Sequence, residues 1–281
     1  MSKGKQIIKD SQLRYKKGLG QNFIYDEGLL KELVRASGVQ KEDCVLEIGP
    51  GSGTMTAILA SVCQKVLALE IDERLLPILH EKLAAHGNVQ VVQGDVLQEN
   101  LVDLTRPLGD SFFVVANIPY YITTPLLTLL LTGGLPIKSL SVMVQKEVAD
   151  KMLAQPGTEE YGMLSVRCQY FGLPSIAMQV PAACFTPPPK VDSAFVVMPI
   201  RKTPPVKVLD ETVFFKVANA AFAMRRKTMA NNLQSTFSIS RQDAEELLRK
   251  SGIDGMVRGE KLSLEDFAAL ANAYVNIQSG K

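Results

Sequence analysis

The stretch Val45–Gly53, VLEIGPGSG, decides the fold of this chain of 281 residues. Together with Cys44, its first half is an apolar run of the length expected for a buried strand, Cys44–Ile48. Its second half is rich in glycine, and a segment with helical spacing, Thr54–Val62, follows at once. A strand, a glycine-rich turn and a helix in this order are typical of an α/β domain with a ligand at the strand ends.

Strand and helix patterns alternate from this stretch outward. We expect strands at Cys44–Ile48, Lys65–Glu70, Val89–Gln93, Phe112–Asn117, Ser139–Gln145, Ile176–Val180 and Ala194–Ile200. We expect a helix capped by Asp26 and further helices at Thr54–Val62, Asp72–Ala85, Thr123–Leu131, Lys146–Leu153 and Gly162–Tyr170. The alternation predicts an α/β fold with a doubly wound, mainly parallel sheet.

The end of the chain has a different pattern. Residues 201–208, RKTPPVKV, contain two prolines and no periodicity, and we interpret them as a linker. Beyond it we expect only helices, at Glu211–Ala223, Thr228–Leu233, Arg241–Lys250 and Leu264–Tyr274. The sequence therefore predicts a basic arm over 1–20, an α/β domain over 21–200, the linker over 201–208 and a small helical domain over 209–281.

Composition excludes several classes of protein. Hydrophobic residues make up 46% of the chain and charged residues 21%, which is enough to build a core. The four cysteines have no close spacing, so we expect neither a disulfide scaffold nor a metal site. No apolar run reaches the roughly 18 residues of a membrane span, and no signal core opens the chain. We therefore expect a soluble, cytoplasmic protein, and we expect a monomer.

The net charge of +2 conceals an uneven distribution. Residues 1–17 carry six basic side chains and one acid, residues 18–200 carry 12 against 19, and residues 201–281 carry 13 against 9. These charges are compatible with solvated faces and a free tail. The alternative is an acidic catalytic body with basic ends that bind phosphates.

Polar signals follow four of the expected strands. The turn after the first contains Gly49 and Gly51, which allow a ligand to lie against the backbone. The second ends at Glu70, which can accept hydrogen bonds from ribose hydroxyls, and Asp95 after the third can accept from an adenine amino group. A dinucleotide fingerprint needs a further glycine where Thr54 stands. The spacing instead suits a nucleoside without phosphates, such as S-adenosylmethionine.

The fourth strand end, Asn117-Ile118-Pro119-Tyr120, resembles the Asn/Asp-Pro-Pro-Tyr box of amino methyltransferases. An adenine amine is a poor nucleophile, so the site needs acceptors for both amino hydrogens. The Asn117 side-chain oxygen and the Ile118 carbonyl can supply them. Pro119 stiffens the loop, and Tyr120 offers a ring on which an extruded base can stack.

Taken together, the motifs resemble those of the KsgA-type ribosomal RNA adenine dimethyltransferases over about residues 15 to 275. The matching segments are GQNF at 20–23, VLEIGPGSG at 45–53, LEID at 69–72, GDV at 94–96, NIPYY at 117–121, VQKEVA at 144–149 and FTPPPKVDS at 185–193. GQNF and FTPPPKV are the most specific of them. The resemblance covers the helical end as well.

The resemblance implies a set of site residues. For S-adenosylmethionine these are Asn22, Ile24, Gly49, Glu70, Asp95 and Asn117, to which the glycine turn adds Gly51. The implied catalytic residues are Asn117, Ile118, Pro119 and Tyr120, with Phe185 stacking on the other face of the base.

The implied substrate is a pair of adjacent adenosines in a hairpin near the 3′ end of small-subunit rRNA, each methylated twice at N6 within a pre-ribosomal particle. Phosphate contacts are expected from Arg225, Arg226 and Lys227, from Lys190, and from the basic arm. The arm's basic residues are Lys3, Lys5, Lys9, Arg14, Lys16 and Lys17.

Three other functions stay open on the sequence. A macrolide-resistance type dimethyltransferase would share both pockets but act on large-subunit rRNA; FTPPPKV and the longer helical end favour the small-subunit enzyme. A ribosome-assembly or transcription factor could keep the fold without catalysis, against which the complete set of Glu70, Asp95 and Asn117–Tyr120 argues. A nicotinamide-linked dehydrogenase is disfavoured by Thr54.

Overall fold

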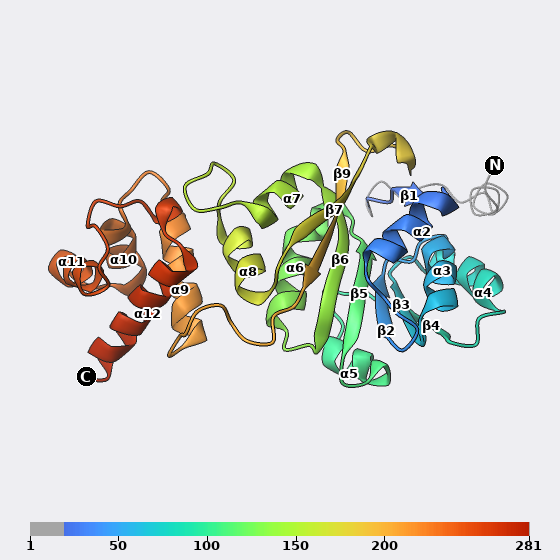
Figure 1. Ribbon diagram of the computed structural model, residues 1–281, viewed down its shortest axis with the longest axis horizontal. Coiled ribbons are helices and arrows are strands. Elements are labelled where there is room, and N and C mark those ends of the chain that lie inside the picture. Colours follow the sequence, from blue (N-terminus) through green and yellow to red (C-terminus); the bar gives the residue numbers. More distant parts are fainter. Residues whose placement is uncertain (1–19, 281) are drawn as a thin grey trace. The chain divides into compact units, whose positions relative to one another are not determined.

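The computed structural model describes residues 20–280 (Figure 1). The chain divides into two compact units. The first, here the sheet unit, contains the described residues up to Ala149 together with Leu173–Ile200. The second, here the helical unit, contains Asp150–Gly172 and the residues from Arg201 onward. The sequence analysis places residues 150–172 in the α/β domain over 21–200. In the structure they belong to the helical unit.

The sheet unit is built on seven strands in the order β4-β3-β2-β5-β6-β9-β7. Their bounds are β2 (Cys44–Ile48), β3 (Lys65–Glu70), β4 (Val89–Gln93), β5 (Phe112–Asn117), β6 (Ile137–Gln145), β7 (Ser175–Val180) and β9 (Ser193–Pro199). The first five are mutually parallel, and β9 runs antiparallel to both β6 and β7. The prediction of a doubly wound, mainly parallel sheet is confirmed.

Helices connect these strands. They are α3 (Thr54–Val62), α4 (Leu76–Leu83), α5 (Leu101–Thr105) and α6 (Thr123–Thr132), and α2 (Glu27–Ala36) precedes β2. A further helix, α7 (Lys146–Leu153), follows β6, and its residues from Asp150 onward belong to the helical unit. The Asp26 carboxylate accepts from the amides of Gly28 and Leu29, so α2 begins where the sequence predicts it. The expected helix Asp72–Ala85 is shorter, because Asp72 caps a single 3-10 turn before α4.

Side chains along β2 alternate between the two faces of the sheet. Val45 and Glu47 point to one face of the sheet and Leu46 and Ile48 to the other. Val45 packs into a buried cluster with side chains of α2 and α3, among them Leu33 and Leu59. Glu47 is fully buried.

A second, two-stranded sheet joins distant segments. β1 (Phe23–Ile24) pairs antiparallel with β8 (Phe185–Thr186), so that Phe23 lies opposite Thr186 and Ile24 opposite Phe185. This pairing brings together the two most specific sequence motifs. Strands of two residues are too short to give an alternation pattern, and the sequence analysis missed both.

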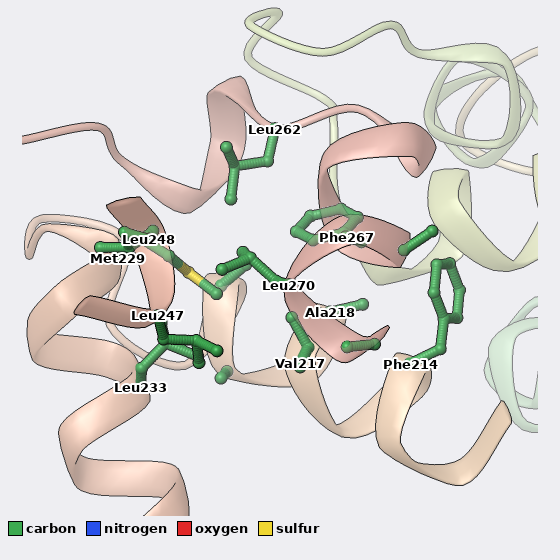
Figure 2. Packing of buried hydrophobic residues seen from close by; sticks show 14 of the residues in the cluster. Phe214, Val217, Ala218, Met229, Leu233, Leu247, Leu248, Leu262, Phe267 and Leu270 are labelled. Atoms are coloured by element: carbon green, nitrogen blue, oxygen red, sulfur yellow. The ribbon is translucent and has the colours of Figure 1, made fainter. Parts of the chain in front are cut away.

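The helical unit has its own core. Its helices are α8 (Met163–Phe171), α9 (Glu211–Ala223), α10 (Met229–Phe237), α11 (Arg241–Lys250) and α12 (Leu264–Gln278). Phe214, Leu233 and Phe267 are fully buried here (Figure 2). Tyr161 and Tyr170 belong to the same cluster, and the Tyr161 hydroxyl donates to the Leu262 carbonyl over 3.0 Å. These contacts are why residues 150–172 belong to this unit.

Three findings bear on the classes that composition excludes. Within residues 20–280, no helix combines the length and apolar character needed to span a bilayer. All four cysteines are free thiols. No group of three or more His, Cys, Asp or Glu side chains in this described part of the chain is arranged to hold a metal ion.

Candidate active site

The glycine turn between β2 and α3 is the floor of the site. Gly49, Gly51 and Gly53 have φ values of 73°, 57° and 70°, a region that favours glycine. A β-carbon on Gly51 would lie only 2.6 Å from the Phe23 ring. Only glycine therefore fits at position 51, and the turn can approach a ligand through its backbone.

Lys82 holds this turn from the side of α4. Its Nζ donates to the Ser52 carbonyl over 3.0 Å and to the Thr54 hydroxyl over 2.7 Å. Burial lowers the pKa of the Lys82 ammonium. Lys82 is not among the predicted site residues, because a lysine on a helix is typically a solvated surface side chain.

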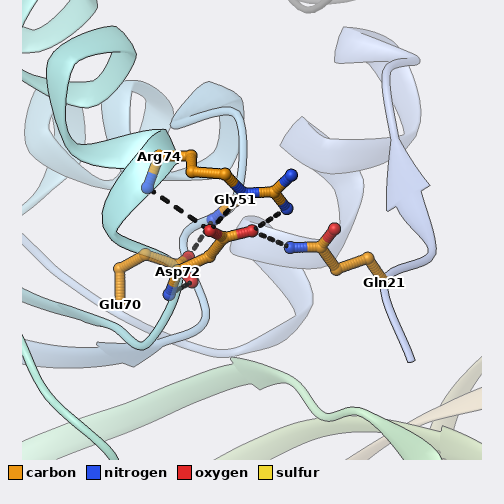
Figure 3. A network of polar contacts seen from close by, with 5 residues as sticks. All are labelled: Gln21, Gly51, Glu70, Asp72 and Arg74. Atoms are coloured by element: carbon orange, nitrogen blue, oxygen red, sulfur yellow. Dashed lines mark hydrogen bonds and ion pairs between the residues drawn. The ribbon is translucent and has the colours of Figure 1, made fainter. Parts of the chain in front are cut away.

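Glu70, at the end of β3, lies over the glycine turn and is 4% exposed. Its Oε2 accepts from the Gly51 amide over 3.0 Å, and its Oε1 accepts from the Asp72 amide over 2.8 Å (Figure 3). Burial raises the pKa of the Glu70 carboxyl. Each oxygen keeps a lone pair, so Glu70 can still accept hydrogen bonds from a ligand.

Asp72 adds a second acid that the sequence analysis did not assign to the site. Arg74 donates to its two oxygens, from Nε over 2.8 Å and from a terminal nitrogen over 2.6 Å. Gln21 donates from Nε2 over 2.9 Å, as Figure 3 shows. The bonds from Arg74 lower the pKa of Asp72 to about 2. Asp72 thus fastens the segment before β1 to the end of β3.

Asp95 lies in a pocket beside this floor. The pocket walls are mostly apolar and include Ile71, Leu97, Pro119 and Tyr121. The Asp95 carboxylate accepts from the Leu97 amide over 3.0 Å and from Gln98 Nε2 over 2.9 Å. A mostly apolar pocket with one carboxylate acceptor suits a purine that carries an amino group.

The strand-end motif after β5 forms the opposite wall. Asn117 Nδ2 donates to the Asn22 carbonyl over 2.9 Å, which leaves Oδ1 as the acceptor end of the amide. The Ile118 side chain is buried, and its amide contacts the Met143 carbonyl at 3.4 Å. Asn117, Ile118, Pro119 and Tyr120 line one cavity with Gly49, Gly51 and Glu70. The structure thus brings most of the predicted residues together.

Asn22 directly precedes β1 and Ile24 lies in it, and both border the site. Asn22 lines the cavity described above. Ile24 lines a neighbouring cavity that also borders Gly49 and Asn117. Both predicted positions therefore lie at the site, Asn22 through its backbone carbonyl and Ile24 through an apolar contact.

Phe185 lies in the two-stranded sheet beside the site. It is 3% exposed and packs into the hydrophobic cluster of the sheet unit, where β8 pairs with β1. Its stacking on the target base stays a prediction. A more exposed aromatic is Tyr121, which is 57% exposed and lines the Asp95 pocket.

Glu47 is a further acid that the sequence analysis did not assign. It lines the cavity beneath Gly49 and Asn117. Complete burial raises its pKa to about 8. A carboxyl inside an otherwise apolar strand is the signal that could have identified it.

The predicted phosphate-binding residues in the described part of the chain all lie on the surface, and Arg225 also makes contacts within the protein. Arg226 and Lys227 are exposed between α9 and α10, and Lys190 is exposed in the sheet unit. Arg225 donates to the Glu159 carbonyl over 2.8 Å and lies 3.7 Å from Glu260 in an ion pair. Arg225 thus stabilises the helical unit. The arm residues Lys3 to Lys17 fall outside the described residues.

The chain resembles known proteins along nearly its whole length. Residues 12–276 match the family model described as ribosomal RNA adenine dimethylase. A ribosomal RNA small subunit methyltransferase A from Oceanobacillus iheyensis is 42% identical over 99% of this chain and 96% of that protein. A protein of the same name from Bacillus cereus strain B4264 is 46% identical over 96% of this chain and 95% of its own length.

Two solved structures resemble the fold of this chain. A dimethyladenosine transferase from Plasmodium falciparum superposes with a TM-score of 0.78 at 24% identity, over 92% of this chain and 98% of that one. The 23S rRNA methyltransferase ErmE superposes with a TM-score of 0.69 at 27% identity, over 90% and 99%. The fold, the grouped strand ends and the match over residues 12–276 lead to one conclusion: the chain belongs to the ribosomal RNA adenine dimethylase family, enzymes that use S-adenosylmethionine.

Proposed function

We propose that the protein transfers methyl groups from S-adenosylmethionine to the N6 amino groups of two adjacent adenosines in the 3′-terminal hairpin of small-subunit rRNA, twice on each. The observation that carries the proposal is the single cavity in which Asn117–Tyr120 face Gly49, Gly51 and Glu70. The names of the relatives, ribosomal RNA small subunit methyltransferase A, support the choice of subunit.

The residues present fit this cofactor. The glycine turn has no β-carbon at position 51, so a ligand can lie on its backbone. We assign the ribose to Glu70 and the adenine to the pocket of Asp95, with Asn22, Ile24 and Asn117 around the remainder. When bound, the cofactor supplies a methyl group on a positively charged sulfur.

The remaining work falls to the chain's own side chains. Asn117 Oδ1 and the Ile118 carbonyl accept the two amino hydrogens of the target base, which increases electron density on N6. Tyr120 supports the extruded base, a contact worth about 1–3 kcal/mol in base-stacking sites. Pro119 fixes the loop between them. Because the methyl group would arrive on a positively charged sulfur, which leaves as a neutral thioether, the site needs alignment more than a strong base. The proton that the methylated N6 loses passes to solvent.

We further propose that exposed cations bind the RNA. Arg226 and Lys227 on the helical unit and Lys190 on the sheet unit supply phosphate contacts, together with the basic arm over residues 1–20. The enzyme then acts as a monomer on a pre-ribosomal particle in the cytoplasm. The acidic sheet unit is suited to the cationic cofactor, whereas the basic side chains are suited to the polyanion.

One labelling experiment tests this function. The protein is incubated with radiolabelled S-adenosylmethionine and undermethylated small subunits, large subunits or naked rRNA, and digested RNA is analysed for dimethyladenosine. We expect label in small subunits alone. Label in large subunits instead would identify an activity like that of ErmE, and label in no RNA would leave a non-catalytic assembly factor.

A further inference from the structure

The hydroxyls of Tyr120 and Ser193 lie 2.8 Å apart and form a hydrogen bond. Tyr120 belongs to the strand-end motif after β5, whereas Ser193 is the first residue of β9, 73 positions later. Ser193 is only 1% exposed, and Tyr120 is half-buried. The bond therefore connects the proposed base-binding loop to the end of the segment FTPPPKVDS.

Ser193 sits on a rigid frame. Its strand is flanked on both sides, with Gln145 of β6 and Val180 of β7 as its partners. The preceding residue, Asp192, accepts through its carbonyl from the Lys146 amide over 3.0 Å and through Oδ1 from the Ala182 amide over 2.8 Å. The backbone position of Ser193 is thus fixed by several independent contacts.

Tyr120 is held less firmly by its own backbone. It begins a single 3-10 turn, Tyr120–Ile122, whose closing bond runs from the Ile122 amide to the Pro119 carbonyl over 3.1 Å. An aromatic side chain on such a turn can rotate about two torsions unless its tip is fixed. The Ser193 hydroxyl fixes that tip.

We propose that Ser193 is a positioning residue that sets the ring plane of Tyr120 for the target base. The proposal rests on the proposed function. The bond uses the phenolic oxygen at the end of the ring, so the bond itself covers neither face of the ring. Ser193 acts through Tyr120 and does not line the cavity of Glu70 and Asn117.

This arrangement separates substrate effects from cofactor effects. Loss of the Ser193 hydroxyl should lower kcat/KM for small subunits about 3- to 10-fold, as expected for one neutral hydrogen bond. The dissociation constant of S-adenosylmethionine should not change. Because the two hydroxyls act as one unit, Ser193→Ala, Tyr120→Phe and the double variant should have about the same kcat/KM.

The matched control is Ser141→Ala. Ser141 is fully buried on the neighbouring strand β6, opposite Val197 of β9, and its hydroxyl contacts no hydrogen-bonding partner within residues 20–280. This variant removes the same atom from the same sheet without touching Tyr120. It should keep the wild-type kcat/KM.

A spectroscopic readout tests the contact without relying on activity. The protein contains seven tyrosines, and labelling them with carbon-13 at Cζ gives a resonance for Tyr120 that Tyr120→Phe identifies. That resonance should move in Ser193→Ala and stay in place in Ser141→Ala.

The outcomes are distinct. An unmoved resonance, additive losses in the double variant, or a weakened cofactor affinity in Ser193→Ala would each overturn the proposal. If Ser193→Ala does not fold, Tyr120→Phe still removes the bond and must give the same 3- to 10-fold loss. Absence of label with the wild-type protein would instead reject the proposed function, while the resonance would still test the contact.

Discussion

Asn117 Nδ2 donates to the backbone carbonyl of Asn22 over 2.9 Å, across 95 positions of the chain. This bond determines which end of the Asn117 amide faces the site. The nitrogen is bonded to Asn22, the residue before β1, and the oxygen remains for a substrate amine. The segment before α2 therefore orients the proposed catalytic amide.

The first prediction concerns Asn117→Ala. Loss of a preorganised hydrogen-bonding group of this kind typically lowers kcat about 100-fold or more. We expect methyl transfer to small subunits to fall by at least that factor, as measured by incorporation of radiolabel. The control is an unchanged far-ultraviolet circular dichroism spectrum. Transfer at the wild-type rate would reject the role of Asn117.

The second prediction uses Gly51→Ala. The new methyl group would lie 2.6 Å from the Phe23 ring at a φ of 57°, so the turn must shift under the cofactor. We expect the affinity for S-adenosylmethionine to fall at least about 10-fold by calorimetry, about 1.4 kcal/mol. Gly38→Ala is the matched control, because Gly38 has a φ of 75° and open space around it. Equal affinities in the two variants would contradict this prediction.

The third prediction concerns Glu47 and pH. In the folded protein burial raises the pKa of Glu47 to about 8, from an ordinary value of 4.5 in the unfolded chain. Between these values the folded state holds the proton more tightly, so the free energy of unfolding decreases as pH rises. The slope from this group is at most about 1.4 kcal/mol per pH unit.

Glu47→Gln removes that decrease. The stability of the variant relative to the wild type should therefore rise between about pH 5 and about pH 8, as measured by urea unfolding of both proteins. Groups shared by the two proteins cancel in the difference. A difference that is constant, or that falls with pH, would show that Glu47 ionises at an ordinary pH.

The fourth prediction concerns the charges between α9 and α10. Replacing Arg226 and Lys227 by Glu should weaken binding to small subunits and reduce the salt dependence of the binding constant, by roughly one logarithmic slope unit per lost phosphate contact. Arg225 is left intact because it pairs with Glu260. The control combines Lys202→Glu and Arg258→Glu, since both are exposed cations of the same unit and the net charge changes by the same amount. An equal loss in the control would indicate a general effect of net charge.

The regular elements were predictable from the sequence because their signals are local. The bounds of β2, β3, β4, β5, α3 and α9 agree with the predicted ones residue by residue, since apolar periodicity and caps such as Asp210 lie within the elements themselves. The carboxyl ends of parallel strands meet at one edge of the sheet. For that reason the grouping of Gly49, Glu70 and Asn117 was predictable as well.

Features that depend on distant pairing were not predictable. Gln21 and Asp72 meet across 51 positions, and no pattern in either segment indicates the other. Phe185 pairs with Ile24, and no local pattern in either segment indicates that pairing. Residues 150–172 join the helical unit through Tyr161 and Tyr170, whose partners come later in the chain.

The helical unit is built from two separate segments of the chain, and this has a consequence for synthesis of the chain. Tyr161 and Tyr170 belong to a core that also needs Phe214, 44 residues after Tyr170, and Phe267, 97 residues after Tyr170. At a rate of synthesis of about 5–20 residues per second, these aromatic side chains have no packing partners for several seconds after they are made. A nascent chain stopped after β9 would expose them, and a fragment that ends at Ile200 should aggregate unless the exposed segment is also removed. A split into separately expressed domains must therefore keep residues 150–172 with the C-terminal half.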